Sequence, residues 1–532
     1  MANFRIVDLF AGPGGLAEGF SGFTREDGSR PFEISFSVEK ESSAHATLRL
    51  RAFLRQFGTC FPEEYYTALN SGNTLPDFAA LYPDQWAAAE AEALNLELGT
   101  DAARLILKKR LKQLVADAGD RTILIGGPPC QAYSLVGRAR NKGKKDYRAE
   151  DDKRHFLYRE YIDILRTLEP AAFVMENVKG LLSSSVDGSL VGNRILADLK
   201  TVSKKHGGYR LVALSGGTDL LGRNASPALA DFVIRAEHHG VPQARHRVII
   251  VGVRQDICRQ PGISSLMENA LQLNVEPPVG IGSVIGDMPA MRSGLSRGDD
   301  VKLWKAAVLV AADTVIAAAA KRDTKVAKVA RAARAELRKS AADLRRKATA
   351  RSSVPNSCPP ELRNWLVDKK IERLPNNETR GHMPSDLARY LFAAAFGQVH
   401  GRSPKAADFP AELAPDHANW NSGKFADRFR VQLIDRPGTT VTSHISKDGH
   451  YFIHPDPVQC RSLTVREAAR IQTFPDNYMF LGNRTQQYVQ VGNAVPPYLA
   501  RQIAAALDSV LRDAGFDRVS SSMHAKSVAR SA

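Results

Sequence analysis

Short apolar runs alternate with longer stretches of helical periodicity over the first 255 residues. Each run is rich in branched and aromatic residues and is bounded by Gly, Pro or charge, so each predicts a buried strand. The runs are FRIVDLF (4–10), FEISFSV (32–38), TILIGG (122–127), AAFVMEN (171–177) and RVIIVGV (247–253). Strands separated by helices are typical of parallel βαβ units. The pattern therefore predicts an α/β fold with a doubly wound, mostly parallel sheet.

The intervening segments predict helices. Residues 92–119 have helical periodicity, and residues 301–351 combine Ala, Lys and Arg with apolar residues at helical spacing. Lys321 to Arg351 hold twelve basic and three acidic residues. This segment is either a solvated helix or helical hairpin, or a helix that lies along a phosphate backbone.

Regular patterns return near the carboxyl terminus. Thr464 followed by Glu467 is a capping box that predicts a short helix ending before Pro475, and residues 498–514 have the period of an apolar helix. We divide the chain into residues 1–255, a second part at 256–460, a segment at 461–510, and a disordered tail at 511–532.

Composition adds a basic character to this picture. The 532 residues carry a net charge of +16, which suits a polyanionic partner, although an acidic membrane surface would suit it as well. No apolar run approaches the roughly 18 residues of a membrane span, and the amino terminus does not resemble a signal peptide. We therefore expect a cytoplasmic protein. The five cysteines are scattered without a CxxC pair, which argues against a disulfide framework and a zinc site.

A glycine-rich turn, Asp8-Leu-Phe-Ala-Gly-Pro-Gly-Gly-Leu-Ala17, follows the first strand. Such a turn lets backbone N–H groups approach a ligand. Glu39, at the end of the next strand, is placed to accept hydrogen bonds from ribose hydroxyls, and Phe10 to cover an adenine. The same spacing fits a dinucleotide site or a mere turn. The candidate cofactor residues here are Phe10, Gly12, Gly14, Gly15, Leu16 and Glu39.

Cys130 stands in Gly126-Gly-Pro-Pro-Cys-Gln131, directly after a predicted strand. A lone cysteine in a cytosolic protein is more often an inert core residue. Two prolines, however, hold this thiol in a rigid turn at the carboxyl end of a strand, where ligands of doubly wound sheets bind. The sequence around Cys130 therefore favours a catalytic nucleophile over an inert core residue.

Two further motifs add charged groups to this edge. Glu176 and Asn177 end another predicted strand, which places a carboxylate near Cys130; a helix-capping pair is the other interpretation. Gln243, Arg245 and Arg247 alternate on an extended segment and would point together toward a nucleotide and its phosphate. On its own, such a stretch is more often a solvated basic segment.

Taken in order, these four motifs resemble those of the DNA cytosine-5 methyltransferase family. Residues 461–476 and Gln490-Val-Gly-Asn-Ala-Val-Pro-Pro497 resemble the last two motifs of that family. The resemblance covers residues 4–255 and 435–508. It implies a Rossmann-like S-adenosylmethionine-dependent methyltransferase fold with an inserted smaller target-recognition domain, and it adds Pro128, Asn493 and Val495 to the cofactor site.

The resemblance also implies a reaction. Cys130 would attack carbon 6 of a cytosine flipped out of duplex DNA, Glu176 would bind the ring, and Arg245 and Arg247 would assist. Residues 136–154 are basic and have no apolar period, so they form either a loop that closes on the DNA or an ordinary solvated loop. The family places an acidic residue near the adenine, for which Asp101 is our candidate. We expect a monomer that acts on double-stranded DNA in a type II restriction-modification system, with a possible cognate restriction endonuclease.

Three other functions fit parts of the pattern. Methylation of transfer RNA uses the same motifs, but the distinctive Cys-Phe-Thr element of that branch is missing. A non-catalytic DNA-binding protein would have no use for the thiol of Cys130. A dehydrogenase would use the glycine turn but would leave the Pro-Pro-Cys turn unexplained.

Overall fold

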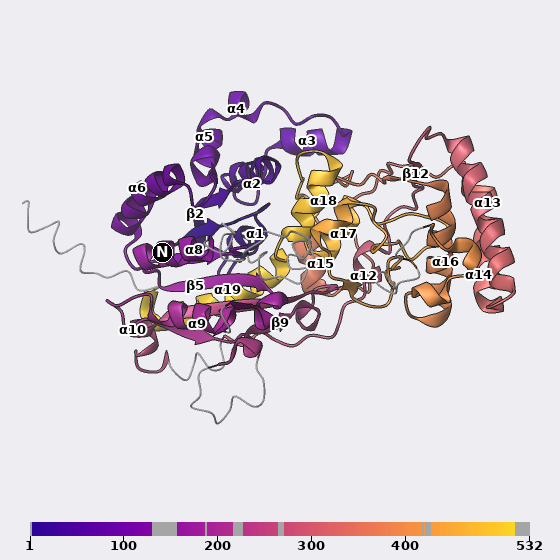
Figure 1. Cartoon of the computed structure of the whole chain (residues 1–532). Helices are drawn as coiled ribbons and strands as arrows, with labels where there is room; N and C mark the ends of the chain where they lie inside the picture. The colour runs from indigo at the N-terminus through magenta and orange to yellow at the C-terminus, as the bar shows by residue number, and fades with distance from the viewer. Residues whose placement is uncertain are drawn as a thin grey trace, which may run out of the picture.

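A β-sheet lies at the centre of the larger part of the molecule, with helices around it (Figure 1). The computed structural model describes residues 3–129, 157–186, 189–215, 227–263, 271–416, 420 and 427–516. Seven strands follow the order β3-β2-β1-β4-β5-β11-β8, and β9 pairs with β11. Their bounds are β1 (Phe4–Leu9), β2 (Phe32–Glu39), β3 (Ala93–Asn95), β4 (Thr122–Gly126), β5 (Ala172–Val178), β8 (Tyr209–Val212), β9 (Val233–Arg235) and β11 (His246–Arg254).

The sheet is doubly wound and mostly parallel, as the sequence predicts. Strands β3, β2, β1, β4 and β5 pair in parallel, and β11 is antiparallel to β5 and β8. The chain first winds outward from β1 to β3 and then returns to β4 on the other side of β1. The carboxyl ends of β1 and β4 therefore meet at a topological switch point, where such sheets bind ligands.

All five predicted strands are present, but the prediction for residues 92–119 is partly wrong. That segment begins with β3, and the helix α6 covers only Asp101–Ala118. Three residues are too few to show a strand period, so the sequence pattern merged β3 into the helix.

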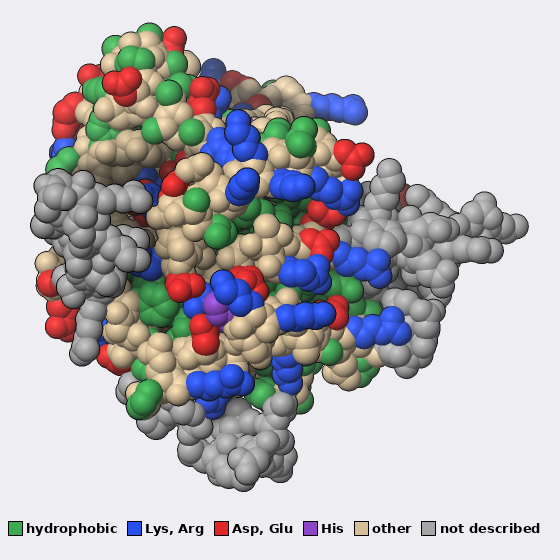
Figure 2. Space-filling view, turned by 90° about the vertical axis from the view of Figure 1, so that its left-hand side faces the viewer, with side chains coloured by type: hydrophobic (Ala, Val, Ile, Leu, Met, Phe, Trp, Pro, Cys, Tyr) green, Lys and Arg blue, Asp and Glu red, His purple; other side chains and the backbone are tan. Residues whose placement is uncertain are grey.

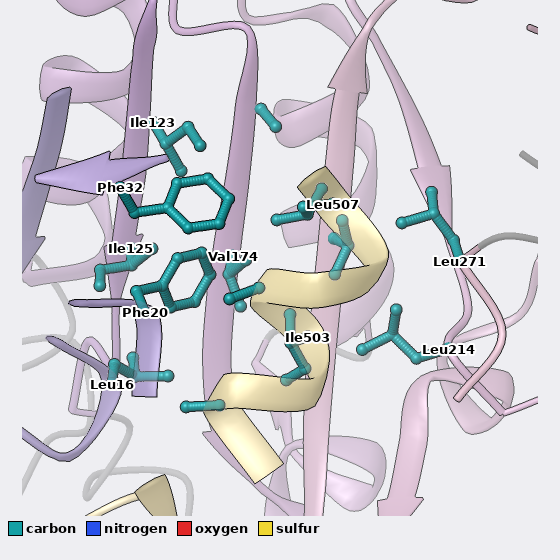
Figure 3. Packing of buried hydrophobic residues seen from close by; sticks show 14 of the residues in the cluster. Leu16, Phe20, Phe32, Ile123, Ile125, Val174, Leu214, Leu271, Ile503 and Leu507 are labelled. Atoms are coloured by element: carbon teal, nitrogen blue, oxygen red, sulfur yellow. The ribbon is translucent and has the colours of Figure 1, made fainter. Parts of the chain in front are cut away.

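Helices cover both faces of the sheet. One face holds α1 (Gly15–Ser21), α10 (Gln255–Cys258) and α19 (Pro497–Leu511), and the other holds α6, α8 (Leu157–Leu168) and α9 (Val191–Thr201). Figure 3 shows Ile503 and Leu507 of α19 beside Val174 of β5. Four more helices lie beyond β2 and β3: α2 (Ser42–Arg55), α3 (Glu63–Ser71), α4 (Phe78–Leu81) and α5 (Pro83–Glu92).

The carboxyl-terminal segment thus lies against the sheet that the first residues form. Helix α19 continues to Leu511, and a π turn follows at Arg512–Phe516, so residues 511–516 are helical rather than part of a disordered tail. The rest of the predicted tail lies outside the described residues.

A helical cluster stands at the far end of the molecule from α6 (Figure 1). It contains α13 (Val301–Ala320), α14 (Thr324–Ser340) and α16 (Pro384–His400), packed around the buried Trp304. The predicted helical hairpin is therefore present as α13 and α14. By length and composition alone α13 could cross a membrane, so the expectation that no apolar run reaches that length is wrong. Its Val308 and Val315 are buried in the cluster, which identifies it as a core helix.

The segments between sheet and cluster are short. They include α12 (Gly282–Ile285), α15 (Pro360–Leu366), α17 (Val465–Ile471), α18 (Arg484–Asn493) and the paired short strands β10 (Gln243–Ala244) with β14 (Gly438–Thr439) and β12 (Gly294–Leu295) with β13 (Gly381–His382). The predicted capping box is present, because Thr464 and Glu467 each bond the other's backbone N–H at the start of α17.

Candidate active site

A cavity of about 440 Å³ opens at the carboxyl ends of β1, β2, β4 and β5. Its volume lies within the range of small-molecule sites. Sequence segments far apart in the chain meet here, because α18 and the residues after it reach back to the glycine turn. Nine predicted residues line the cavity: Phe10, Gly12, Gly15, Leu16, Glu39, Pro128, Glu176, Asn493 and Val495.

The glycine turn packs tightly against the returning chain. Gly14 has φ +98°, a conformation that favours glycine, and caps α1. A Cβ atom on Gly15 would lie 2.3 Å from the carbonyl oxygen of Val495, and the Tyr478 hydroxyl donates a hydrogen bond to the carbonyl of Pro13. The turn and the carboxyl-terminal segment therefore hold each other in place.

We predict that Gly15→Ala disrupts this contact. The added methyl group meets backbone, which cannot swing aside, so we expect a loss of about 1–3 kcal/mol in the free energy of unfolding and weaker cofactor binding. Denaturant unfolding and cofactor titration measure the two effects. Gly28→Ala, in open space at φ +80°, is the control, and it should leave cofactor affinity unchanged. Equal cofactor affinities for wild type and Gly15→Ala would contradict the prediction.

Glu39 is held in a fixed orientation at the cavity wall. Its Oε2 accepts a hydrogen bond from the N–H of Gly12 (2.8 Å) and its Oε1 accepts one from the N–H of Glu41 (2.8 Å). A carboxylate has about four acceptor sites, so each oxygen retains capacity for a ligand hydroxyl. This geometry suits the role predicted for Glu39.

The cavity is acidic. Five carboxylates line it, those of Asp8, Glu39, Glu41, Glu97 and Glu176, against one cation, Lys40. Asp8 is fully buried, and neither of its carboxylate oxygens has a hydrogen-bond partner among the described residues. Burial raises the pKa of Asp8 well above its ordinary value, and neighbouring carboxylates add to that effect while Arg55 opposes it. Such a lining favours a cationic ligand.

We predict that Asp8→Asn stabilises the free protein at neutral pH and weakens its hold on a cationic ligand. Because the folded pKa of Asp8 lies above the unfolded value, wild type loses stability as pH rises from 3.8 toward the folded pKa. The difference between variant and wild type should therefore grow from acidic to neutral pH in urea unfolding. The exposed Asp101→Asn is the control. If the difference in unfolding free energy between Asp8→Asn and wild type did not change with pH, the raised pKa of Asp8 would be contradicted.

Asp101 does not line the cavity. Its side chain is fully exposed at the start of α6 and pairs with Arg104 (3.2 Å). Glu97 lines the cavity instead, just after β3, and bonds Lys40 (3.2 Å). Acidic residues that follow a strand lie at the edge of the sheet where ligands bind. A predicted strand at β3 would therefore have made Glu97 a candidate for the cavity.

Cys130 lies outside the described residues, as does the predicted loop at 136–154. The chain leading to the cysteine is well defined. Strand β4 ends at Gly126, and the following Pro128 and Pro129 line the cavity. The buried Asn177 donates a hydrogen bond from Nδ2 to the carbonyl of Pro128 (3.1 Å). Asn177 thus anchors the proline turn to the neighbouring strand, a partner that the sequence did not reveal.

Glu176 and Arg247 form an ion pair at the same rim. Their strands, β5 and β11, are antiparallel neighbours, and Arg247 Nε lies 2.9 Å from Glu176 Oε1. Burial lowers the pKa of Arg247, and the Glu176 carboxylate offsets part of this effect. A Cβ on Gly127 would lie 3.1 Å from Glu176 Oε2, so this carboxylate is close to the proline turn.

Gln243 and Arg245 are brought together but not toward the cavity. Both are fully buried, and both bind the backbone of Val441: Gln243 Oε1 accepts from its N–H (2.7 Å), and Arg245 Nη1 donates to its carbonyl (2.8 Å). Burial also lowers the pKa of Arg245 strongly. These two residues therefore fix the returning chain, and Arg247 alone of the three reaches Glu176.

A switch-point cavity, a glycine turn and a carboxylate beside a Pro-Pro turn together define an enzyme that acts next to a nucleotide-type cofactor. Residues 106–509 match the model of the C-5 cytosine-specific DNA methylases. The chain belongs to this family, and it is a DNA (cytosine-5-)-methyltransferase.

Curated relatives match nearly the whole chain. The type II methyltransferase M.Bpa9945I of Bacillus paralicheniformis is 32% identical and covers 95% of this chain and 99% of its own. The type II methyltransferase M.AgeI of Thalassovita gelatinovora is 27% identical and covers 94% and 99%. The fold is similar to that of a prophage-encoded DNA modification methyltransferase of E. coli, with TM-score 0.51, 17% identity, and 96% and 100% of the two chains covered.

Proposed function

We propose that the protein transfers a methyl group from S-adenosylmethionine to carbon 5 of a flipped cytosine in a specific duplex sequence, with Cys130 as nucleophile. The observation that supports this best is the Glu176–Arg247 pair, which stands beside the proline turn that precedes Cys130 and borders the acidic cavity. One rim thus presents the groups that a cytosine ring needs next to a space for the cofactor.

The residues of the cavity fit the cofactor that the family implies. S-adenosylmethionine carries a sulfonium and an ammonium group, and the lining offers five carboxylates, including that of Asp8, whose oxygens accept no hydrogen bond from any described residue. Glu39 would bind the ribose hydroxyls, and the glycine turn leaves room for close approach of the ligand to the backbone. When bound, the cofactor supplies an electrophilic methyl group.

The protein's own groups would activate the base. The Cys130 thiolate forms a bond to carbon 6 of cytosine, which makes carbon 5 nucleophilic enough to take the methyl group. Glu176 binds the exocyclic amine beside N3 and relays to N3 the proton that the Cys130 thiol releases on becoming the thiolate. Arg247 holds the Glu176 carboxylate in place. A base, for which solvent water suffices, then takes the proton from carbon 5, the thiolate leaves carbon 6, and N3 returns its proton through Glu176, so that the aromatic ring is restored.

Duplex DNA must bind between the sheet and the recognition part, because the target base has to leave the stack and reach the cavity. We assign recognition to residues 256–460. Helix α14 contributes an exposed basic face there, with Lys325, Lys328, Arg331, Arg338 and Lys339. The face on the α6 side also carries lysine and arginine side chains among acidic ones, so positive charge is not confined to α14 (Figure 2).

The biological role that we propose is host protection in a type II restriction-modification system. Two relatives that match along nearly their whole length are named type II methyltransferases. The methyl mark would block a restriction endonuclease that cuts the same sequence. We propose that the enzyme acts as a monomer, one strand at a time.

Bisulfite sequencing of a plasmid from cells that express the protein tests this function. Protected cytosines confined to one short sequence, and missing from cells with an empty vector, are the expected result. Conversion of every cytosine in the presence of folded protein would refute DNA methylation at this site. Protected cytosines in the RNA of the same cells would instead assign the activity to RNA.

A further inference from the structure

A second pocket, of about 410 Å³, lies between the catalytic part and the segment that follows α14. It is distinct from the cofactor cavity and shares no lining residue with it. Its walls come from the end of α3, from residues 347–348 and 373–378, from Val465 and Met479, and from the start of α18. In Figure 1, α3 and α18 lie next to each other at the top of the molecule.

Two arginines with spare donors face this pocket. Arg373 uses Nη1 to bind the carbonyl of Ser71 (3.0 Å), and Arg484 uses Nη1 to bind the carbonyl of Thr379. Among the described residues neither guanidinium has a carboxylate partner. Each guanidinium carries five N–H donors, so most of these donors have no partner within the described part of the chain. The pocket's one carboxylate, Glu378, is already paired with Lys347 (3.1 Å) and Arg346 (3.4 Å).

A buried amide lines the same pocket and points to a missing acceptor. Asn377 is 6% exposed, and its Oδ1 accepts a hydrogen bond from the Thr464 hydroxyl (3.0 Å). Its Nδ2 has no hydrogen-bond partner in the part of the chain that the structure describes. A buried donor without an acceptor is unfavourable, and a ligand with acceptor oxygens would satisfy it.

We propose that this pocket binds a phosphate group through Arg373, Arg484 and the Asn377 amide. Three donor groups from different segments match a tetrahedral anion with several acceptor oxygens, and arginine is the residue suited to bidentate phosphate recognition. The phosphate belongs either to the DNA backbone beside the target site or to a free phosphate compound. The pocket shares no lining residue with the cofactor cavity, so the proposal does not depend on the chemistry assigned to Cys130.

Helix α18 connects this pocket to the cofactor cavity. Arg484 is its first residue and lines the phosphate pocket, and Asn493 is its last and lines the cofactor cavity. The two sites are thus separated by the length of a ten-residue helix, about 15 Å. A DNA phosphate held here would be set at a fixed distance from the cofactor.

Two measurements on the full chain test the site. The first is duplex affinity as a function of salt, and the second is calorimetric titration with inorganic phosphate at constant ionic strength. The variants are Arg373→Gln with Arg484→Gln, and Asn377→Asp, which keeps the shape but presents oxygens in place of the amide donor. Lys108→Gln with Lys112→Gln removes the same charge from the exposed face of α6. Thermal unfolding and cofactor binding check that each variant is folded.

If DNA is the source, both site variants should reduce the slope of log affinity against log salt by about 0.9, the value for one phosphate, and the α6 control should not. If the source is a free phosphate compound, the slope of log DNA affinity against log salt should equal that of wild type. In that case both site variants should bind inorganic phosphate at least tenfold more weakly. The proposal would be overturned if either site variant, while folded, kept both the wild-type salt dependence of DNA affinity and the wild-type affinity for inorganic phosphate. Neither readout requires methyl transfer, so this failure is separate from failure of the proposed function.

Discussion

Replacing Cys130 with alanine should abolish methyl transfer, lowering the rate by at least about four orders of magnitude, because no other thiol can take its place. Cys258, Cys358 and Cys460 are buried, and burial raises the pKa of each thiol, to about 11 for Cys258 and Cys358. They remain protonated at neutral pH, and the thiolate is the reactive form. Cys60 is exposed but does not line the cavity.

Transfer of a radiolabelled methyl group to duplex DNA measures the loss. The variant should bind cofactor and DNA like wild type, because the cysteine is needed for bond formation and not for the fold. Cys60→Ala is the matched control and should retain full activity. Wild-type rates in Cys130→Ala would exclude this thiol as the nucleophile.

The sequence predicted the strands that carry the site because those strands are long and apolar. Strands β1, β2, β4, β5 and β11 each span five to nine residues. Strand β3 has three residues and no period of its own. Without β3, nothing in the sequence marked where the ligand edge begins, and the candidate became Asp101, which lies outside the cavity, and not Glu97, which lines it.

Long-range packing accounts for what the pattern at residues 243–247 could not show. Alternation correctly placed Gln243 and Arg245 on one side of the chain. What occupies that side is Val441, almost two hundred residues later, whose backbone binds both side chains. A local pattern carries no information about such a distant partner. Arg247 differs because its partner, Glu176, lies on the adjacent strand.

The same reasoning explains the Thr464–Glu467 capping box, which was predicted correctly. Both of its residues and both of its hydrogen bonds lie within four positions of the chain. Local geometry determines it, whereas the cofactor cavity requires α18 to pack against the glycine turn.

Glu176→Gln should lower kcat by about 10²–10³-fold, with little change in the KM for DNA. Glutamine keeps the size of the side chain but cannot carry the charge that Arg247 faces, and it cannot deliver a proton to the cytosine ring. The effect falls on the chemical step because the missing interaction strengthens as the thiol adds. Asp101→Asn, which removes a fully exposed carboxylate outside the cavity, is the control and should retain the wild-type kcat.

A double-mutant cycle with Arg247→Gln separates a reacting carboxylate from a structural one. If Arg247 acts by holding Glu176 in place, the double variant should be barely slower than Glu176→Gln alone. Steady-state kinetics of the four proteins, with unfolding curves for each, provide the comparison. A kcat for Glu176→Gln within threefold of wild type would show that this carboxylate does not take part in the reaction, and losses that simply add would show that Arg247 acts independently of it.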